Sequence, residues 1–193
     1  MIINPRVILN TNNGPVESDV YSYMFNERVI FLNEEINDDT AQAVIGQLLF
    51  LEKINPNEDI TIYINSPGGV VSAGLAIIDT MNYIHCDVST VCMGQCASMG
   101  AVILACGEKG KRYILPNSEV MIHQPSGGAY GQCSDIEIVA KNITRVKQKM
   151  AKLIADKTDN EYEKVLADID RDYWLSGEEA VDYGLVDSVI YER

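Results

Sequence analysis

Residues 88–105 read VSTVCMGQCASMGAVILA, and this stretch decides the fold. Residues 88–93 are β-branched and apolar, which predicts a buried strand. Small residues then make a tight turn, and the small, apolar run from Ser98 to Ala105 suits a buried helix. A strand that passes directly into a helix is half of a β–α–β unit, so a mainly parallel sheet is expected.

The rest of the chain repeats this alternation of strands and helices. Further strands are predicted at residues 29–32, 60–64, 112–115, 119–122 and 186–190. Helices are predicted from Asp38 or Asp39 to Lys53, from Val70 to Ile84, and at residues 161–167 and 177–183. The longest helix, which is amphipathic, should run from about Ser134 to Lys157. We therefore expect an α/β fold of repeated β–α–β units with right-handed crossovers, undivided by any linker.

The composition limits the classes of function. The 193 residues carry a formal net charge of −13, and because phosphate binding needs clustered Lys and Arg, no nucleic-acid partner is expected. The sequence has no uncharged apolar run of about 18 residues, which argues against a membrane partner. Five cysteines without a C-x-x-C pair, together with two histidines, give poor support for a zinc site. Since the first residues do not resemble a signal peptide, we expect a cytoplasmic protein with reduced thiols.

Two histidines are available as a catalytic base. His85 ends a predicted helix beside Cys86 and Asp87, a surface position where a cation is favoured by the helix C-terminus. His123 instead leaves a predicted strand and precedes a glycine-containing loop, residues 124–128. Functional sites are commonly built on such loops, so His123 is the candidate base.

Ser98 is the candidate nucleophile. It stands where a strand turns into a helix, so its hydroxyl would lie at a helix N-terminus, where free N–H groups favour negative charge. Its neighbours Ala97, Gly100 and Ala101 are small enough to let a substrate approach. A serine that merely caps the helix would have the same sequence context, so this motif alone leaves both interpretations open.

Pro67-Gly68-Gly69 ends another predicted strand. Proline followed by glycine suits a type II turn, and the second glycine exposes a backbone N–H with no side chain beside it. That amide could pair with the N–H of Met99 to form an oxyanion hole. A plain turn has the same sequence, so this motif alone is weak evidence.

Together these motifs predict acyl transfer, which needs a nucleophile, a base and an oxyanion site at neighbouring strand ends. A triad also needs an acid that holds the tautomer of the imidazole. Asp168, Asp170 and Asp172 are all candidates, and the residues alone do not choose between them. The nucleophile elbow of an α/β-hydrolase is excluded, because it would read G-x-S-x-G and position 96 is Cys.

Four motifs, INSPGG (64–69), ASMGA (97–101), GKR (110–112) and MIHQP (121–125), carry a resemblance to a known family. From about Tyr21 to the C-terminus the chain resembles ClpP, the proteolytic subunit of the ATP-dependent Clp protease. The resemblance implies a crotonase-like α/β fold, with residues 1–193 forming a single proteolytic-subunit domain. Residues 1–20 would be an axial segment, and about 124–157 would form a protruding handle that contains the long helix.

The resemblance also implies a role for each site residue. Ser98 matches the nucleophile of the family, His123 matches its base, and Asp172 matches the aspartate of the triad. Gly69 and Met99 match the residues whose backbone amides form the oxyanion hole.

An assembly is implied as well. The handle would interlock two seven-membered rings into a barrel, a tetradecamer with its active sites inside, and Arg171 matches an arginine that makes contacts between the rings. Such a subunit degrades unfolded chains that an AAA+ unfoldase delivers. ATP is used by that partner, so neither a cofactor nor a metal is expected in this subunit.

The chain departs from the family pattern in four places. Residues 13–17, in the axial segment, replace a usual Arg-Gly-Glu run. Thr61 stands where many members have an aromatic residue in the docking pocket for the unfoldase, although Tyr63 is kept. Ser126 replaces a usual leucine beside the substrate groove. Cys96 replaces a usual alanine, and here we expect a small buried residue, with redox control of the nucleophile as the minor alternative.

The sequence therefore predicts a serine endopeptidase, with two alternatives. One is a weakly active or regulatory paralogue that works only in a hetero-oligomer with another Clp subunit, which the departures at the axial segment and at Thr61 motivate. The other is a crotonase-type acyl-CoA enzyme, which shares the fold and the pair of oxyanion amides but does not need the order Ser, His, Asp found here.

Overall fold

A computed structural model describes residues 5–11 and 14–192. The strands of these residues are β1 (Arg6–Thr11), β2 (Gly14–Asp19), β3 (Val29–Leu32), β4 (Ile60–Ser66), β5 (Val88–Ala97), β6 (Arg112–Ile114), β7 (Glu119–Ile122), β8 (Tyr173–Ser176) and β9 (Ser188–Val189). The helices are α1 (Val20–Asn26), α2 (Asp38–Ile54), α3 (Val71–Tyr83), α4 (Met99–Ala105), α5 (Cys133–Thr158), α6 (Tyr162–Asp168) and α7 (Gly177–Tyr183). Residues 1–4, 12 and 13 of the expected axial segment lie outside the described residues.

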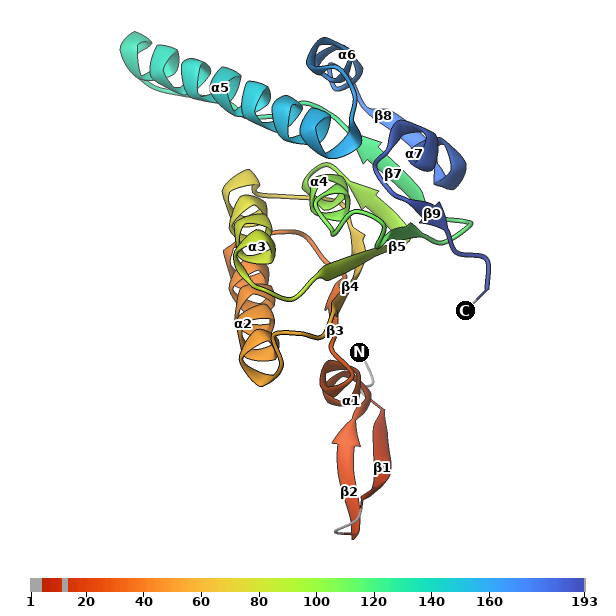
Figure 1. Ribbon diagram of the computed structural model, residues 1–193. Coiled ribbons are helices and arrows are strands. Elements are labelled where there is room, and N and C mark those ends of the chain that lie inside the picture. The colour runs from red at the N-terminus through yellow and green to blue at the C-terminus, as the bar shows by residue number, and fades with distance from the viewer. Residues whose placement is uncertain (1–4, 12–13, 193) are drawn as a thin grey trace.

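The main sheet is largely parallel and branches at β5 (Figure 1). Strands β3, β4, β5, β6 and β9 lie side by side in that order, all parallel. The first half of β5 pairs with β6, whereas its last residues pair with β7, also in parallel. Strand β8 then pairs with β7 in the antiparallel direction. The predicted α/β fold with a mainly parallel sheet is confirmed.

Gly94 marks the branch of β5. Its φ is 79°, a value that glycine adopts without steric penalty. Its N–H donates to the hydroxyl of Ser118 at 2.8 Å. At the same level the register of β4 against β5 shifts between Ile64 and Ser66. Because of this irregularity, β5 leaves β6 and continues beside β7, which brings the ends of β5 and β7 together.

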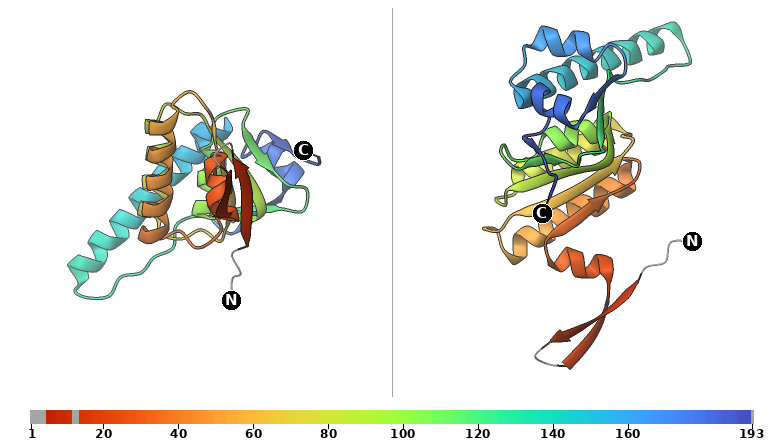
Figure 2. Two further views of the ribbon diagram at one scale, coloured as in Figure 1. Left: turned by 90° about the horizontal axis from the view of Figure 1, so that it is seen from below. Right: turned by 90° about the vertical axis from the view of Figure 1, so that its right-hand side faces the viewer.

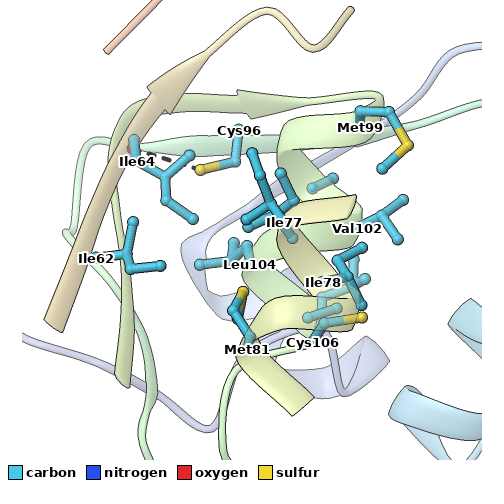
Figure 3. Close-up of a cluster of buried hydrophobic side chains, with 14 of the residues drawn as sticks. Ile62, Ile64, Ile77, Ile78, Met81, Cys96, Met99, Val102, Leu104 and Cys106 are labelled. Carbon is cyan, nitrogen blue, oxygen red and sulfur yellow. Dashed lines mark hydrogen bonds between the residues drawn. The ribbon is translucent and has the colours of Figure 1, made fainter. Parts of the chain in front are cut away.

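Helices α2 and α3 lie side by side along one face of β3, β4 and β5, and α4 lies beside the upper end of α3 in Figure 1. The core between these layers is apolar, as Figure 3 shows for Ile62 and Ile64 of the sheet against Ile77 of α3 and Leu104 of α4. Each of these four side chains is fully buried. Removing one such side chain from water contributes about 1.5–3 kcal/mol, so this core fixes α4 against the sheet.

The cap of α2 differs from the one expected. The Oδ1 atom of Asn37 accepts the N–H of Thr40 at 3.0 Å, and Oγ1 of Thr40 accepts the N–H of Asn37 at 2.9 Å. This reciprocal pair is a capping box, so the expected cap at Asp38 or Asp39 is wrong. Both aspartates lie in the first turn instead, where carboxylates still interact favourably with the helix dipole.

Four elements were not among the predicted ones. Strands β1 and β2 form an antiparallel hairpin that, with α1, projects at the bottom of Figure 1. Helix α1 is capped by Asp19, whose carboxylate accepts the N–H groups of Tyr21 and Ser22 at 3.0 Å each. Strand β8 is the fourth, and it directly follows the three candidate aspartates. The last predicted strand, 186–190, is shorter in the structure, at Ser188–Val189.

The long helix α5 lies within one residue of its predicted bounds at each end. Its buried residues begin only at Met150, and its first half projects past the body of the molecule, at the upper left of Figure 1 and in both views of Figure 2. Ile136 and Ile138 on this projecting half are 41% and 65% exposed. In the described part of the chain, no helix has the length and apolar character needed to cross a membrane.

Candidate active site

Ser98 joins β5 to α4 with unusual backbone angles, φ 53° and ψ −121°. A non-glycine residue at positive φ is strained and persists only where the surrounding structure holds it. The N–H of Ser98 donates to the carbonyl of Met121 in β7 at 2.8 Å, and this hydrogen bond helps to hold the strained backbone of Ser98 in place. Although Ser98 occupies the N-cap position of α4, its side chain makes no capping hydrogen bond. The hydroxyl is therefore directed elsewhere, and the interpretation as a simple capping serine does not hold.

His123 follows β7 and lies between Ser98 and Asp172. Its Nε2 atom is 2.9 Å from Oγ of Ser98, and its Nδ1 atom is 2.8 Å from Oδ1 of Asp172. The side chain of His123 is 26% exposed and that of Asp172 is 63% exposed, so the imidazole is largely covered while the carboxylate is open to solvent. The geometry joins the three predicted residues in one chain of hydrogen-bonding groups.

The pairing of β7 with β8 explains why His123 and Asp172 meet. Ile122, the last residue of β7, lies opposite Tyr173, the first residue of β8. In an antiparallel pair, the next residue after one strand lies opposite the residue before the other. One further step in this register therefore brings His123 opposite Asp172.

The three candidate aspartates have different partners. Oδ2 of Asp168 accepts the hydroxyl of Tyr183 at 2.8 Å. The backbone carbonyl of Asp170 accepts Nε2 of Gln124 at 2.7 Å. Of the three, Asp172 is the one whose carboxylate is within hydrogen-bonding distance of the imidazole of His123. Of the three candidates that the sequence motifs left open, the geometry therefore favours Asp172.

The Pro67-Gly68-Gly69 turn lies against Ser98. Gly68 has φ 93° and Gly69 has φ 149°, both in the region that favours glycine. A Cβ atom on Gly68 would lie 2.7 Å from Cβ of Ser98, and one on Gly69 would lie 2.1 Å from the carbonyl oxygen of Ile36. A side chain at either position would collide, so the turn lies this close to Ser98 because residue 68 is glycine, and this close to Ile36 because residue 69 is glycine.

Two backbone N–H groups beside Ser98 are available as donors. Within residues 5–11 and 14–192, no hydrogen bond engages the N–H of Gly69 or that of Met99, the first residue of α4. By contrast, the N–H of Gly68 donates to Oγ of Ser66 at 3.1 Å, and the N–H of Val70 donates to the carbonyl of Ile36 at 2.7 Å. A tetrahedral oxyanion needs donors of this kind, held beside the nucleophile before the reaction starts.

Cys96 is fully buried two residues before Ser98. Its thiol donates to the carbonyl of Ile64 at 3.5 Å, the contact drawn as a dashed line in Figure 3. Burial raises the pKa of the Cys96 thiol well above its usual range, and the neighbouring Cys92 acts in the same direction. Because the thiolate is the reactive form of cysteine, these features favour the small buried residue over redox control.

Four further residues were singled out by the family resemblance: Arg171, Ser126, Thr61 and Tyr63. Arg171 and Ser126 are exposed. Thr61 and Tyr63 are partly buried on β4, where the ring of Tyr63 stacks on that of Phe31 with centroids 5.8 Å apart. The roles suggested for these residues concern partner chains and substrate, and stay predictions.

His85, the second histidine, lies on the surface after α3. Its side chain is 83% exposed, and its Nδ1 atom is 3.0 Å from Oε1 of Glu52. This position agrees with the surface residue that the sequence predicted. Across the described residues, no three His, Cys, Asp or Glu side chains are grouped so that they could hold a metal ion.

The sequence motifs did not identify Ser66 as a residue of the site. Ser66 is the last residue of β4 and is fully buried, and its hydroxyl contacts both Glu34 and Gly68. The available signal was a serine directly before Pro67 at a strand end, within the INSPGG motif.

A comparison with protein families gives a result that agrees with this geometry. A family model described as Clp protease matches residues 12–193, nearly the whole chain. The α/β architecture, with its branched parallel sheet and projecting α5, is consistent with the ClpP/crotonase-like fold. The chain therefore belongs to the Clp protease family, whose members are serine peptidases.

Proposed function

We propose that this chain is the proteolytic subunit of an ATP-dependent Clp protease, a serine endopeptidase that hydrolyses peptide bonds of unfolded proteins. The observation that carries the proposal is the chain of contacts from Asp172 through His123 to Ser98, at 2.8 Å and 2.9 Å. Both distances lie in the range over which a base can take a proton from a nucleophile and be oriented by an acid.

The first half of the reaction forms an acyl-enzyme. Nε2 of His123 takes the proton of the Ser98 hydroxyl while Oγ bonds to the carbonyl carbon of the scissile peptide. The electron pair of the C=O double bond moves onto its oxygen, where the N–H groups of Gly69 and Met99 stabilise the oxyanion. His123 then gives its proton to the leaving amine as the C–N bond breaks. Throughout, Asp172 accepts a hydrogen bond from Nδ1–H and holds the tautomer.

The second half of the reaction releases the acyl group as a carboxylic acid. His123 takes a proton from a water molecule whose oxygen attacks the acyl carbon, and a second oxyanion forms in the same place. The bond from that carbon to Oγ then breaks, and Oγ regains its proton from His123. This mechanism uses no cofactor in the subunit, since ATP would be used by the unfoldase.

We also propose that the subunit works in two stacked seven-membered rings to which an AAA+ unfoldase delivers substrate. The projecting half of α5 supports an assembly, because none of its residues is buried in the isolated chain and it leaves apolar side chains exposed. Ile136 and Ile138 are exposed on the projecting half of α5. Beside α1, a pocket of about 360 Å³ is lined in part by Tyr21, Phe25 and Phe31, which suits an apolar group of a partner.

Sizing of the purified protein combined with an assay of peptide cleavage tests this function. We expect rings that cleave a fluorogenic peptide, and degradation of a folded protein only when an AAA+ Clp unfoldase and ATP are added. Cleavage that survives Ser98→Ala would contradict the proposal. Cleavage that appears only after a second Clp subunit is mixed in would favour the hetero-oligomeric alternative.

A further inference from the structure

The hydroxyl of Ser66 joins two segments of backbone inside the protein. Its Oγ donates to the carbonyl of Glu34 at 2.6 Å and accepts the N–H of Gly68 at 3.1 Å. Because Ser66 is fully buried, water does not compete for either bond. A buried hydroxyl that both donates and accepts is fixed in direction, so Ser66 sets the direction of the Gly68 N–H.

The next peptide unit carries the N–H of Gly69. The carbonyl of this unit, which belongs to Gly68, accepts the N–H of Ile36 at 2.8 Å. In a planar trans peptide the C=O and the N–H point in opposite directions. The Gly69 N–H therefore points away from residues 34–36. The N–H of Val70 in turn donates to the carbonyl of Ile36 at 2.7 Å, so the backbone on both sides of Gly69 is hydrogen-bonded to Ile36.

Ser66 also packs against the helix that supplies the second donor. A Cβ atom on Gly100, in the first turn of α4, would lie 3.1 Å from the carbonyl oxygen of Ser66 and 3.4 Å from its Cβ. Ser66 is moreover paired with Cys96 across β4 and β5. The residue thus lies between the turn that carries Gly69 and the first turn of α4, which begins with Met99.

We infer that Ser66 is a positioning residue for the oxyanion hole, acting through the turn that it holds. Its hydroxyl, anchored on the carbonyl of Glu34, keeps the amide of Gly69 in the direction that the oxyanion needs. The inference rests on the proposed serine-peptidase function. An oxyanion donor acts mainly in the transition state, so a loosened donor lowers kcat and leaves ground-state binding of the substrate unchanged.

The test compares Ser66→Ala and Ser66→Cys with Ser89→Ala in the assembled protein. Ser89 is a matched control, because it is a buried serine of β5 whose hydroxyl donates to a backbone carbonyl, that of Lys111 at 2.9 Å, near the opposite end of the strand. Ser66→Cys keeps nearly the same volume but replaces the hydroxyl by a weak hydrogen-bonding group.

We expect both Ser66 variants to lose about ten- to a hundredfold in kcat with KM within about twofold, less than the loss for removing a donor outright. Inhibition by a peptide boronate, whose tetrahedral adduct places an oxygen in the same hole, should weaken in parallel. Ser89→Ala should keep kcat even if its melting temperature falls by a similar amount. An assembled Ser66 variant with the kcat and boronate affinity of the wild type would overturn the inference.

The failure of this inference is distinguishable from failure of the proposed function. If the wild-type protein cleaves peptide and Ser98→Ala does not, the proposed function holds. Wild-type kcat in Ser66→Ala would then argue only against the positioning role of Ser66. If Ser98→Ala cleaves as well as the wild type, the proposed function itself falls, and the inference falls with it.

Discussion

The N–H of Ser98 donates to the carbonyl of Met121 at 2.8 Å, which ties the proposed nucleophile to the strand that leads into the proposed base. Met121 is the last but one residue of β7, and His123 follows that strand. The pairing of β7 with β8 then brings Asp172 opposite His123. Backbone hydrogen bonds of three neighbouring strands thus set the spacing of the triad, so its geometry is a property of the sheet.

Asp172→Asn should lower kcat by about 10²- to 10⁴-fold, because an amide donates to Nδ1 and favours the wrong tautomer of His123. Steady-state peptide cleavage by the assembled protein measures the effect. Asp168→Asn is the matched control, since the carboxylate of Asp168 is bound by the hydroxyl of Tyr183 and not by the imidazole. Equal losses in the two variants would show that the carboxylate of Asp172 has no specific role.

Gly69→Ala should abolish nearly all turnover, a loss of about a hundredfold or more, because the added Cβ would lie 2.1 Å from the carbonyl oxygen of Ile36 and must displace the turn. Gly110→Ala provides the control. Gly110 also has a positive φ, 88°, but a Cβ there meets nothing within 4 Å. Comparable kcat values for the two variants would argue against a role for the turn in catalysis.

The ion pair between Arg112 and Asp187 should make stability depend on pH. Nη2 of Arg112 lies 2.6 Å from Oδ1 of Asp187, and the Arg112 side chain is only 4% exposed. Partial burial acts to raise the pKa of Asp187, but the hydrogen bonds and the charge of Arg112, with the hydrogen bond from the N–H of Gly110, together outweigh this effect and lower the pKa. A carboxyl with a lowered pKa in the folded state stabilises the fold above its unfolded pKa of about 3.9. That contribution is lost as the pH falls through the lower folded value.

Asp187→Asn should therefore destabilise the protein by about 3 kcal/mol near neutral pH, since it leaves the buried charge of Arg112 without its partner. Thermal unfolding of the wild type and the variant between pH 7 and acid measures the difference. We expect the gap in melting temperature to shrink below about pH 4, because the carboxyl then binds a proton in the unfolded chain before it does so in the folded protein. A gap that widens in acid would contradict this account of the pair.

Cys96 should resist alkylation in the folded protein. Its burial and raised pKa leave almost no accessible thiolate, whereas Cys133 at the start of α5 is exposed. Labelling with iodoacetamide followed by peptide mapping should modify Cys96 only after unfolding, and Cys96→Ala should keep the kcat of the wild type. Fast labelling of Cys96 with parallel loss of activity would revive the redox alternative.

Much of the fold could be predicted because its strands are short apolar runs separated by clear turn residues. Strands β3, β4 and β7 illustrate this, and each contributes buried side chains to the core. Strand β8 was missed because three of its four residues are exposed, so its existence depends on pairing with β7 and not on a local apolar pattern. Strands β1 and β2 were not predicted either, because they depend mainly on pairing with each other.

The candidate site was predictable in part for the same reason. Ser98 and His123 follow strands that the sequence makes evident, so their positions at strand ends could be inferred. The choice of Asp172 depends on the register of β7 against β8, which no local pattern contains. The positive φ of Ser98 is likewise a tertiary feature, because a serine adopts φ 53° only where other hydrogen bonds hold it.

The most direct test of the central claim is labelling of the assembled protein with a fluorophosphonate, followed by peptide mapping and a peptide-cleavage assay. We predict a single phosphonylated residue, Ser98, with cleavage lost in proportion to labelling, and little labelling in His123→Ala, because the hydroxyl then lacks its base. Labelling at another residue, or full peptide cleavage by protein whose Ser98 is completely phosphonylated, would contradict the claim.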